Sequence, residues 1–229
     1  VSFDIHAGEI FGIAGVAGNG QKELAEAVTG LRKAIGGTIT ISGEDVTTQG
    51  AKARVKKRVG FIPEDRLSMG LVPGMNMEEN RILKEYDTPR FSKNHILKKK
   101  VIHDTVQDEI NRYAIKTAGD KSPVSLMSGG NQQKLLVARE IGGDPVLLVA
   151  VYPSRGLDMG AAEAIHEILL EQCKKGVAVL LISEELDELF QMSDRIGVLC
   201  SGEMMAVLDR NEADYDTIGR LMSGERYEK

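Results

Sequence analysis

Residues 8–23 read GEIFGIAGVAGNGQKE and join an apolar run to a segment with three further glycines. The apolar run over 8–14 predicts a strand, three glycines predict a tight loop, and apolar residues at helical spacing over 20–31 predict a helix. Glycines allow a loop in which several N–H groups point inward, and the helix N terminus adds partial positive charge. A strand, a glycine loop and a helix in this order are what a phosphate cradle needs.

The loop keeps the glycines of the pattern G-x-x-x-x-G-K-[ST] but loses its last two residues. Gly15, Gly18 and Gly20 are in place, whereas Gln21 takes the lysine position and Lys22 the Ser/Thr position. In this pattern the lysine reaches the β- and γ-phosphates and the hydroxyl holds Mg²⁺. A charge-assisted hydrogen bond contributes about 1.5–3 kcal/mol, so we expect weaker phosphate binding. An ordinary glycine turn is the alternative interpretation of this loop.

The composition is that of a globular chain, with 229 residues, 42% hydrophobic and 28% charged. A net charge of -5 provides no overall basic field for nucleic acid. The basic runs at 53–58 and 98–100 are expected to be solvated faces, one of which could meet phospholipid head groups or a membrane helix. No apolar run approaches the roughly 20 residues that cross a bilayer. The start of the chain, at a valine that leads into a strand, suggests a fragment of a longer polypeptide.

Cysteine and histidine usage predicts neither disulfides nor a metal centre. Cys173 and Cys200 lie in or beside apolar runs and are expected to be reduced core residues. The four histidines are scattered without ligand spacing, so we propose no zinc site.

The rest of the chain alternates between strand and helix patterns, except over 64 to about 127, which is polar and helix-like with no strand expected. Such alternation predicts a largely parallel, covered sheet. The expected strands cover 37–42, 59–62, 145–152, 177–183, 195–200 and 204–209. The expected helices cover 77–86, 93–117, 128–143, 160–174 and 184–192.

Residues 126–134, LMSGGNQQK, place a serine and two glycines at the start of a helix, where a hydroxyl, free N–H groups and the helix dipole can face an anion. A Ser-capped helix without a ligand has the same pattern. The string closely resembles the signature motif of ATP-binding cassette (ABC) ATPases, in the LSGGNQQK form of sugar importers. The resemblance implies that the residues contacting ATP across a dimer interface are Ser128, Gly129, Gly130 and Gln132.

Three further strings resemble the same family but depart from it at the catalytic positions. PVLLVAVYPSRGLDMGA (145–161) resembles the Walker B strand and D-loop, with Val151 and Tyr152 in place of the Mg²⁺-associated aspartate and the catalytic glutamate. RVGFIPEDR resembles the Q-loop region, with Glu64 in place of glutamine, and LLISEELDEL resembles the switch region, with Glu184 in place of histidine. A helix cap with acids in its first turn is an alternative reading of the last string. Asp158 falls in register with the D-loop aspartate, which implies a bridge between two cassettes.

The resemblance spans nearly the whole chain and implies an α/β fold: a P-loop NTPase-like ABC ATPase core with a parallel or mixed sheet, flanking helices and an antiparallel edge. The chain 1–229 would be a single nucleotide-binding domain, with its core at about 1–63 and 131–229 and an inserted α-helical subdomain at about 64–130. Every catalytic position is replaced while the signature is nearly whole. This matches the degenerate C-terminal cassette of twin-cassette importers for ribose- or galactose-type sugars and nucleosides.

The expected function is therefore energy coupling in an importer, with the signature completing the ATPase site of a partner cassette and no confident catalytic residue in this chain. The resemblance implies ATP, with Mg mainly at the partner's site, and residual phosphate binding at the chain's own glycine loop. It implies as partners a second cassette, fused or separate, two membrane permease subunits and an upstream substrate-binding protein, at the cytoplasmic face of the cell membrane.

Two rival hypotheses belong to other classes. One is a non-catalytic module that dimerises and docks without binding nucleotide. The other is a soluble ABC protein acting on nucleic acid or ribosomes, which we do not expect because it would need two working sites and a basic face.

Overall fold

The computed structural model describes residues 1–117, 119 and 121–226. A six-stranded sheet forms the centre of the molecule, in the order β10-β9-β1-β8-β7-β4. All neighbours in it pair in parallel except β10 with β9. Its strands are β1 (Ile10–Ala14), β4 (Val59–Ile62), β7 (Leu147–Val151), β8 (Ala178–Ile182), β9 (Arg195–Cys200) and β10 (Glu203–Asp209). This mixed α/β architecture with one antiparallel edge is the fold class expected from the sequence.

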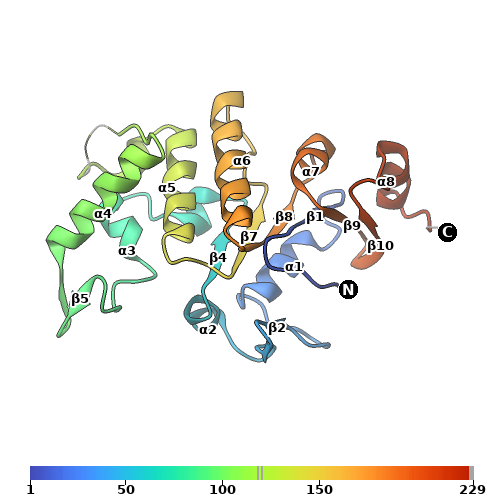
Figure 1. The fold of residues 1–229 in the computed structure, drawn as a ribbon, viewed down its shortest axis with the longest axis horizontal. Coiled ribbons are helices and arrows are strands. Elements are labelled where there is room, and N and C mark those ends of the chain that lie inside the picture. The colour runs from blue at the N-terminus through green and yellow to red at the C-terminus, as the bar shows by residue number, and fades with distance from the viewer. Residues whose placement is uncertain (118, 120, 227–229) are drawn as a thin grey trace.

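Helices lie along both faces of the sheet (Figure 1). On one side stand α5 (Gly129–Ile141), α6 (Met159–Lys174) and α7 (Leu186–Met192), and on the other α1 (Gln21–Val28) and α2 (Ala51–Lys56). Successive residues of a strand point to opposite faces, so each strand supplies two cores. In β8, Val179 and Leu181 belong to the larger core cluster, whereas Leu180 and Ile182 belong to the smaller one.

Because β1, β4, β7, β8 and β9 run parallel, their carboxyl ends meet at one edge of the sheet. The glycine loop follows β1. The segments that resemble the Q-loop, the D-loop and the switch region follow β4, β7 and β8, respectively. Ligands of open parallel sheets bind at this edge. The topology therefore brings together motifs that are up to about 170 residues apart in the chain.

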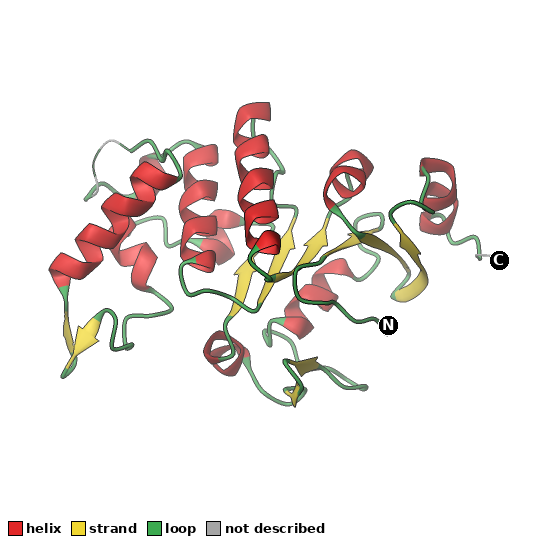
Figure 2. Ribbon diagram, in the orientation of Figure 1, coloured by secondary structure: helices red, strands yellow, loops and turns green. Residues whose placement is uncertain are grey.

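The helical segment 64–130 stands beyond β4, beside the sheet (Figure 2). It contains a π-helical turn, η1 (Arg66–Gly70), then α3 (Met77–Ile82), α4 (Lys99–Arg112) and a 3-10 turn, η2 (Val124–Leu126). The prediction that it holds no strand is wrong. Residues expected to begin a long helix instead form a hairpin of β5 (Ser92–Lys93) and β6 (Ile96–Leu97), because Asn94 and His95 adopt left-handed backbone conformations.

Other boundaries also differ from the sequence prediction. The strand expected over 37–42 is reduced to β2 (Thr40–Ile41), which pairs with β3 (Glu44–Asp45) in a separate two-stranded sheet. Nothing in the sequence reading predicted α2 or the C-terminal helix α8 (Tyr215–Met222). Both are short, with α8 packing on β9 and α2 on β4, so tertiary contacts rather than a long periodic pattern define them.

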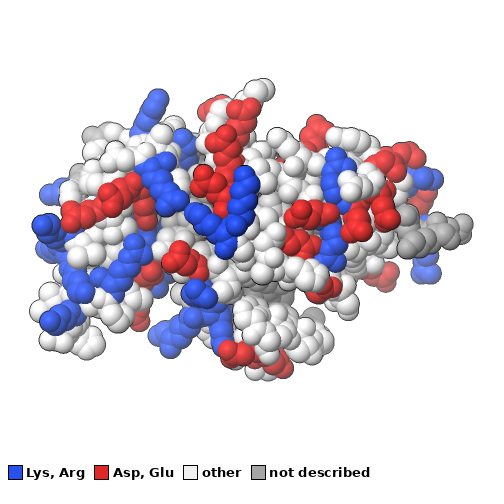
Figure 3. All heavy atoms as spheres, viewed as in Figure 1, with Lys and Arg blue, Asp and Glu red and all other residues white. Residues whose placement is uncertain are grey.

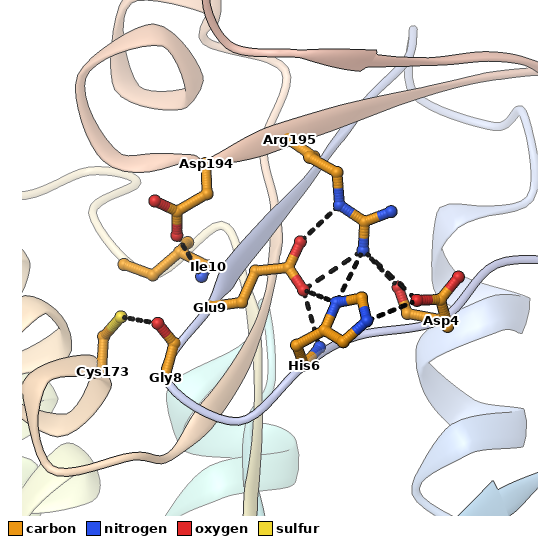
Figure 4. A network of polar contacts seen from close by, with 8 residues as sticks. All are labelled: Asp4, His6, Gly8, Glu9, Ile10, Cys173, Asp194 and Arg195. Atoms are coloured by element: carbon orange, nitrogen blue, oxygen red, sulfur yellow. Dashed lines mark hydrogen bonds and ion pairs between the residues drawn. The ribbon is translucent and has the colours of Figure 1, made fainter.

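A polar network fixes the amino ends of β1 and β9, at the edge opposite the glycine loop (Figure 4). Glu9 accepts hydrogen bonds from the Arg195 guanidinium at 2.6 Å and from the His6 backbone N–H at 2.6 Å. Burial alone would raise the pKa of Glu9, but these hydrogen bonds outweigh it and lower the pKa. Asp194 accepts from the backbone N–H of Ile10 at 2.8 Å. The network joins two strands whose pairing positions the loop at their other ends.

Both cysteines are free thiols, as predicted, but neither is fully buried. Cys173 lies in the same region as that network, where its Sγ donates to the carbonyl oxygen of Gly8 at 3.0 Å (Figure 4). Burial raises the pKa of the Cys173 thiol.

Candidate nucleotide site

The glycine loop connects β1 directly to α1, and its backbone conformation requires glycine. Gly18 and Gly20 have φ angles of 91° and 107°, which side chains disfavour. Gly15 has no room for a side chain, because a Cβ there would lie 2.6 Å from the carbonyl oxygen of Leu199 and 2.5 Å from the Nε2 atom of Gln21. The chain therefore forms the turn that the sequence predicted between strand and helix.

Gln21 is folded back into this loop rather than extended toward solvent. Its side chain is only 2% exposed, and its Nε2 donates to the carbonyl oxygen of Val16 at 2.9 Å. Its Oε1 is buried without a hydrogen-bond partner. An amide at the lysine position can thus brace the loop, but it provides no positive charge for a phosphate.

Lys22 is exposed on α1, and no ion pair joins it to any residue that the structure describes. The loop is held instead from the β9–β10 turn. Asn19 accepts from the backbone N–H of Ser201 through its side-chain oxygen at 2.8 Å, and from that of Gly202 through its carbonyl oxygen at 2.9 Å. The position of the loop is therefore set by the neighbouring strand pair.

Arg155 joins the three replaced positions that follow β4, β7 and β8. Its Nη1 lies 2.5 Å from Oε1 of Glu64, and its Nη2 lies 3.8 Å from Oε1 of Glu184. The guanidinium also stands over the Tyr152 ring, with 5.5 Å between its Cζ and the ring centroid. One cation therefore pairs with a carboxylate from each of two segments, and its single positive charge offsets only half of their combined negative charge. We call Glu64, Tyr152, Arg155 and Glu184 the Arg155 cluster.

Val151 and Tyr152 close the end of β7 with apolar surface. Val151 is 4% exposed and packs in the smaller core cluster. Tyr152 is 9% exposed, has a left-handed backbone with φ 49°, and donates its N–H to the carbonyl oxygen of Ile182 at 2.8 Å. Burial, followed by the carboxylates of Glu184 and Glu64, raises the pKa of the Tyr152 hydroxyl. This hydroxyl is therefore protonated at neutral pH and is a poor general base.

These residues do not fit a Mg²⁺ ion next to a triphosphate. Mg²⁺ requires oxygen ligands, usually carboxylates, hydroxyls and phosphates. The two positions that would supply them hold Val151 and Lys22, and the nearby carboxylates of Glu64 and Glu184 face Arg155. Among the described residues, no group of three or more His, Cys, Asp or Glu side chains could hold a metal ion.

The signature segment presents its serine to solvent at the start of α5. Ser128 is the N-cap residue and is exposed, and its Oγ accepts from Nδ2 of Asn131 at 2.7 Å. The first-turn N–H groups of any helix lack an intrahelical partner. Ser128 makes no side-chain cap to them, so these groups are not satisfied by its hydroxyl. Gly130 packs close to α6, where a Cβ would meet the Cβ of Ala161 at 3.0 Å. An anion could approach this hydroxyl and these N–H groups directly.

Asp158 and Gln132 both make hydrogen bonds within the chain. Asp158 is exposed but caps α6, accepting from the Ala161 N–H at 2.9 Å. Gln132 is 5% exposed, and its Nε2 donates to the carbonyl oxygen of Val124 at 3.0 Å. In this structure the amide of Gln132 therefore braces the signature loop from inside and is not presented to a ligand.

A second polar group at the same edge was missed by the sequence reading. Glu188 of α7 is 4% exposed and accepts from Oγ of Ser154 at 2.6 Å, with Nε2 of His166 2.7 Å from the same oxygen. Burial alone would raise the pKa of Glu188, but the hydrogen bonds from His166 and Ser154 lower it. The spacing of an acid on α7 and a histidine on α6 gives no sequence signal, because only the packing of the two helices brings them together.

Comparisons with known proteins agree with this architecture. The family model described as ABC transporter matches residues 1–150. The chain is 42% identical over 224 residues to "Guanosine import ATP-binding protein NupO" of Bacillus subtilis and 34% identical over 224 residues to "Ribose import ATP-binding protein RbsA" of Shouchella clausii. Each alignment covers 98% of this chain and 44% of the relative.

A solved structure, the dimer of the bacterial ABC transporter cassette MJ0796, has the same fold. It superposes with a TM-score of 0.78 at 19% identity, covering 92% of this chain and 89% of that one. The chain thus belongs to the ABC transporter family and has the fold of its ATP-binding cassette. It spans less than half the length of the relatives named above. In the described part of the chain, no helix has the length and apolar character needed to cross a bilayer.

Proposed function

We propose that this chain is the degenerate cassette of an importer for nucleosides or simple sugars, and that it acts by completing the ATPase site of a partner cassette. The observation that carries the proposal is the Arg155 cluster. Carboxylates of Glu64 and Glu184 at the nucleotide edge are paired with Arg155, while the positions for Mg²⁺ and for a general base hold Val151 and Tyr152. Such an edge can be held in shape without nucleotide, but it cannot activate water.

The exposed start of α5 supports a role across an interface. Ser128 is free to approach a phosphate, and the close contact between Gly130 and Ala161 sets the N termini of α5 and α6 side by side. We propose that Ser128, Gly129 and Gly130 contact ATP bound to the partner, and that Asp158 lies at the same interface. The relatives named for guanosine and ribose import motivate the substrate class.

The chain's own glycine loop has a smaller role in nucleotide binding under this proposal. Gly15, Gly18 and Gly20 shape a loop whose lysine position is filled by a buried amide. We propose that Gln21 and Lys22 allow residual phosphate binding without hydrolysis. ATP with Mg would then be held mainly at the partner's site.

Three exposed apolar residues that lie close together in the sequence support docking to membrane permease subunits, and we call them the apolar patch. Met69, Val72 and Met75 follow Glu64 in the chain, and 49%, 38% and 36% of their surfaces are exposed. Clusters of exposed apolar side chains mark interaction sites more often than isolated ones do. We propose that this patch receives a helix of a permease, which would place the chain peripherally on the inner face of the membrane, where a substrate-binding protein serves the system from the other side.

The test uses phosphate release with Mg-ATP, first for this chain alone and then for the chain assembled with a partner cassette and permeases. We expect no release by the chain alone at any protein concentration. In the assembly, Ser128→Glu places a carboxylate next to a phosphate. Such a like-charge contact costs several kcal/mol, so the rate of phosphate release should fall by about 100-fold. Ser125→Glu, an exposed residue three positions earlier, is the matched control and should leave the rate within about twofold.

Two results would contradict the proposal. Release that rises with the square of the concentration of the isolated chain would mean that homodimers hydrolyse ATP. Full activity of the Ser128→Glu assembly would favour the alternative, a docking module that contacts no nucleotide, which the inward-folded Gln21 amide also fits.

A further inference from the structure

The hairpin of β5 and β6 ends the helical segment 64–130 on the side away from the sheet (Figure 1). We call residues 91–100, FSKNHILKKK, the basic hairpin. Its two-residue turn has φ angles of 50° at Asn94 and 64° at His95, as in the tight turns that match strand twist. The N–H of Lys98 donates to the carbonyl oxygen of Phe91 at 2.8 Å and closes its base.

The base of the hairpin is firmly anchored in the helical segment. The Phe91 side chain is fully buried and clusters with Ile82 and Ile102. The guanidinium carbons of Arg81 and Arg90 stand 5.4 and 4.8 Å from the centre of its ring. A hairpin held in this way presents its tip in a fixed orientation.

The two strands of the hairpin and the first turn of α4 combine exposed apolar side chains with positive charges that form no ion pair with a described residue. Ile96 is 72% exposed and Leu97 is 41% exposed. Lys93, Lys99 and Lys100 are exposed, and none forms an ion pair with a residue that the structure describes. Residues 90–100 hold five Lys and Arg residues and no Asp or Glu, in a chain whose net charge is -5. Figure 3 shows Lys and Arg atoms at the end of the molecule that carries β5 and α4, with Asp and Glu atoms between them.

The two lysines that open α4 are placed against the usual rule for helices. A helix N terminus carries partial positive charge, so cations there are unfavourable and acids are favoured. The first turn of α4 contains no acid, and its N-cap residue, Lys98, makes no side-chain cap. Residues that lower the stability of a helix without a compensating contact are expected at functional surfaces.

We propose that the basic hairpin binds the surface of an anionic phospholipid membrane. Ile96 and Leu97 enter the head-group region, while Lys93, Lys99 and Lys100 pair with lipid phosphates. The positive charge of these lysines complements an anionic membrane and gives no such attraction to a neutral one. Single-stranded nucleic acid is disfavoured, because the aromatic ring of the hairpin, Phe91, is fully buried and cannot stack on a base. The inference does not depend on the nucleotide edge, which lies at another part of the fold.

The test is co-sedimentation of this chain with sucrose-loaded vesicles of phosphatidylglycerol and phosphatidylcholine, against vesicles of phosphatidylcholine alone. We expect binding to the anionic vesicles that weakens with salt. The triple variant Lys93→Gln, Lys99→Gln, Lys100→Gln should bind about 100-fold more weakly, since each lysine near such a surface contributes about fivefold. Ile96→Ser with Leu97→Ser should also weaken binding without unfolding the chain, because both side chains are exposed.

The matched control removes the same charge elsewhere. Lys33, Lys52 and Lys56 are exposed, and no ion pair joins them to a described residue. Their triple change to Gln should lower vesicle binding by less than about threefold. No binding of the wild-type chain to anionic vesicles would overturn the inference, as would equal losses in both triple variants. So would a hairpin variant that lost binding to permeases or RNA but kept vesicle binding. The two proposals can fail separately. If the Ser128→Glu assembly keeps full ATPase activity while the wild-type chain binds anionic vesicles, the membrane inference stands and only the proposed function is refuted.

Discussion

Glu140 is the residue whose removal tests most directly how the helical segment is fastened to the core. Its side chain is completely buried in α5, where Oε2 accepts from the N–H of Phe61 in β4 at 2.8 Å and pairs with the ammonium of Lys84. Its Oε1 accepts from Arg139 at 2.9 Å. Burial by itself would raise the pKa of Glu140, yet the charges of Lys84 and Arg139 lower it. The carboxylate is therefore ionised at neutral pH and joins an edge strand, a helix and the helical segment.

Changing Glu140→Ala leaves two cations and the partly buried N–H of Phe61 without their acceptor. Loss of one partner from a buried charge network costs about 3–5 kcal/mol. For a chain of this size, 1 kcal/mol lowers Tm by about 2–4 °C, so the expected decrease is on the order of 10 °C. Differential scanning calorimetry measures it, and hydrogen exchange should increase over 77–86, because Lys84 loses its attachment. Glu167→Ala, an exposed glutamate on α6, is the control and should change stability by less than about 0.5 kcal/mol.

The pH dependence of this effect has a definite sign. A folded-state pKa below the ordinary value of 4.5 means that Glu140 stabilises the protein above that pH and loses its contribution as the pH falls through the folded value. The difference in Tm between wild type and Glu140→Ala should therefore be full at pH 7 and shrink as the pH falls below 4.5 and through the lowered pKa of Glu140. A variant within about 1 kcal/mol of wild type at pH 7 would refute the assignment of Glu140 as the fastening residue.

Three further predictions concern the nucleotide edge and its support. Glu188→Gln should destabilise the chain by about 1–2 kcal/mol at pH 7, because His166 and Ser154 lose a charged acceptor, and the difference measured in urea should vanish as the pH falls below the lowered pKa of Glu188. Gly15→Ala should cost about 1–3 kcal/mol in the same assay, since its Cβ meets a backbone oxygen at 2.6 Å; wild-type stability would refute the packing of the loop. Cys173 should react with a maleimide more slowly at pH 7 than free cysteine does, because its thiol pKa is raised; an equal rate would contradict its burial.

The replaced residues of the nucleotide edge were identified from the sequence, but their arrangement was not. The register of Val151, Tyr152, Glu64 and Glu184 within known motifs predicted a site without its catalytic groups. Only the parallel pairing of β4, β7 and β8 shows that Arg155 reaches Glu64, which is 91 positions away, and also Glu184. Ion pairs between distant residues carry no local signal, because they follow from the order of strands in the sheet.

The sequence by itself determined the class of fold, since continuous apolar runs become buried parallel strands and glycines become turns whatever else surrounds them. It also determined the loss of charge at Gln21 and the serine that opens the signature helix. The tertiary structure alone decided which way side chains face: Gln132 turned inward, Asp158 capping α6, and a hairpin where a helix was expected. Helical periodicity over 93–117 competes with a left-handed turn at Asn94 and His95, and the burial of Phe91 at the hairpin base favours the turn. Local propensities are worth only a few tenths of a kcal/mol per residue, so packing of this kind overrides them.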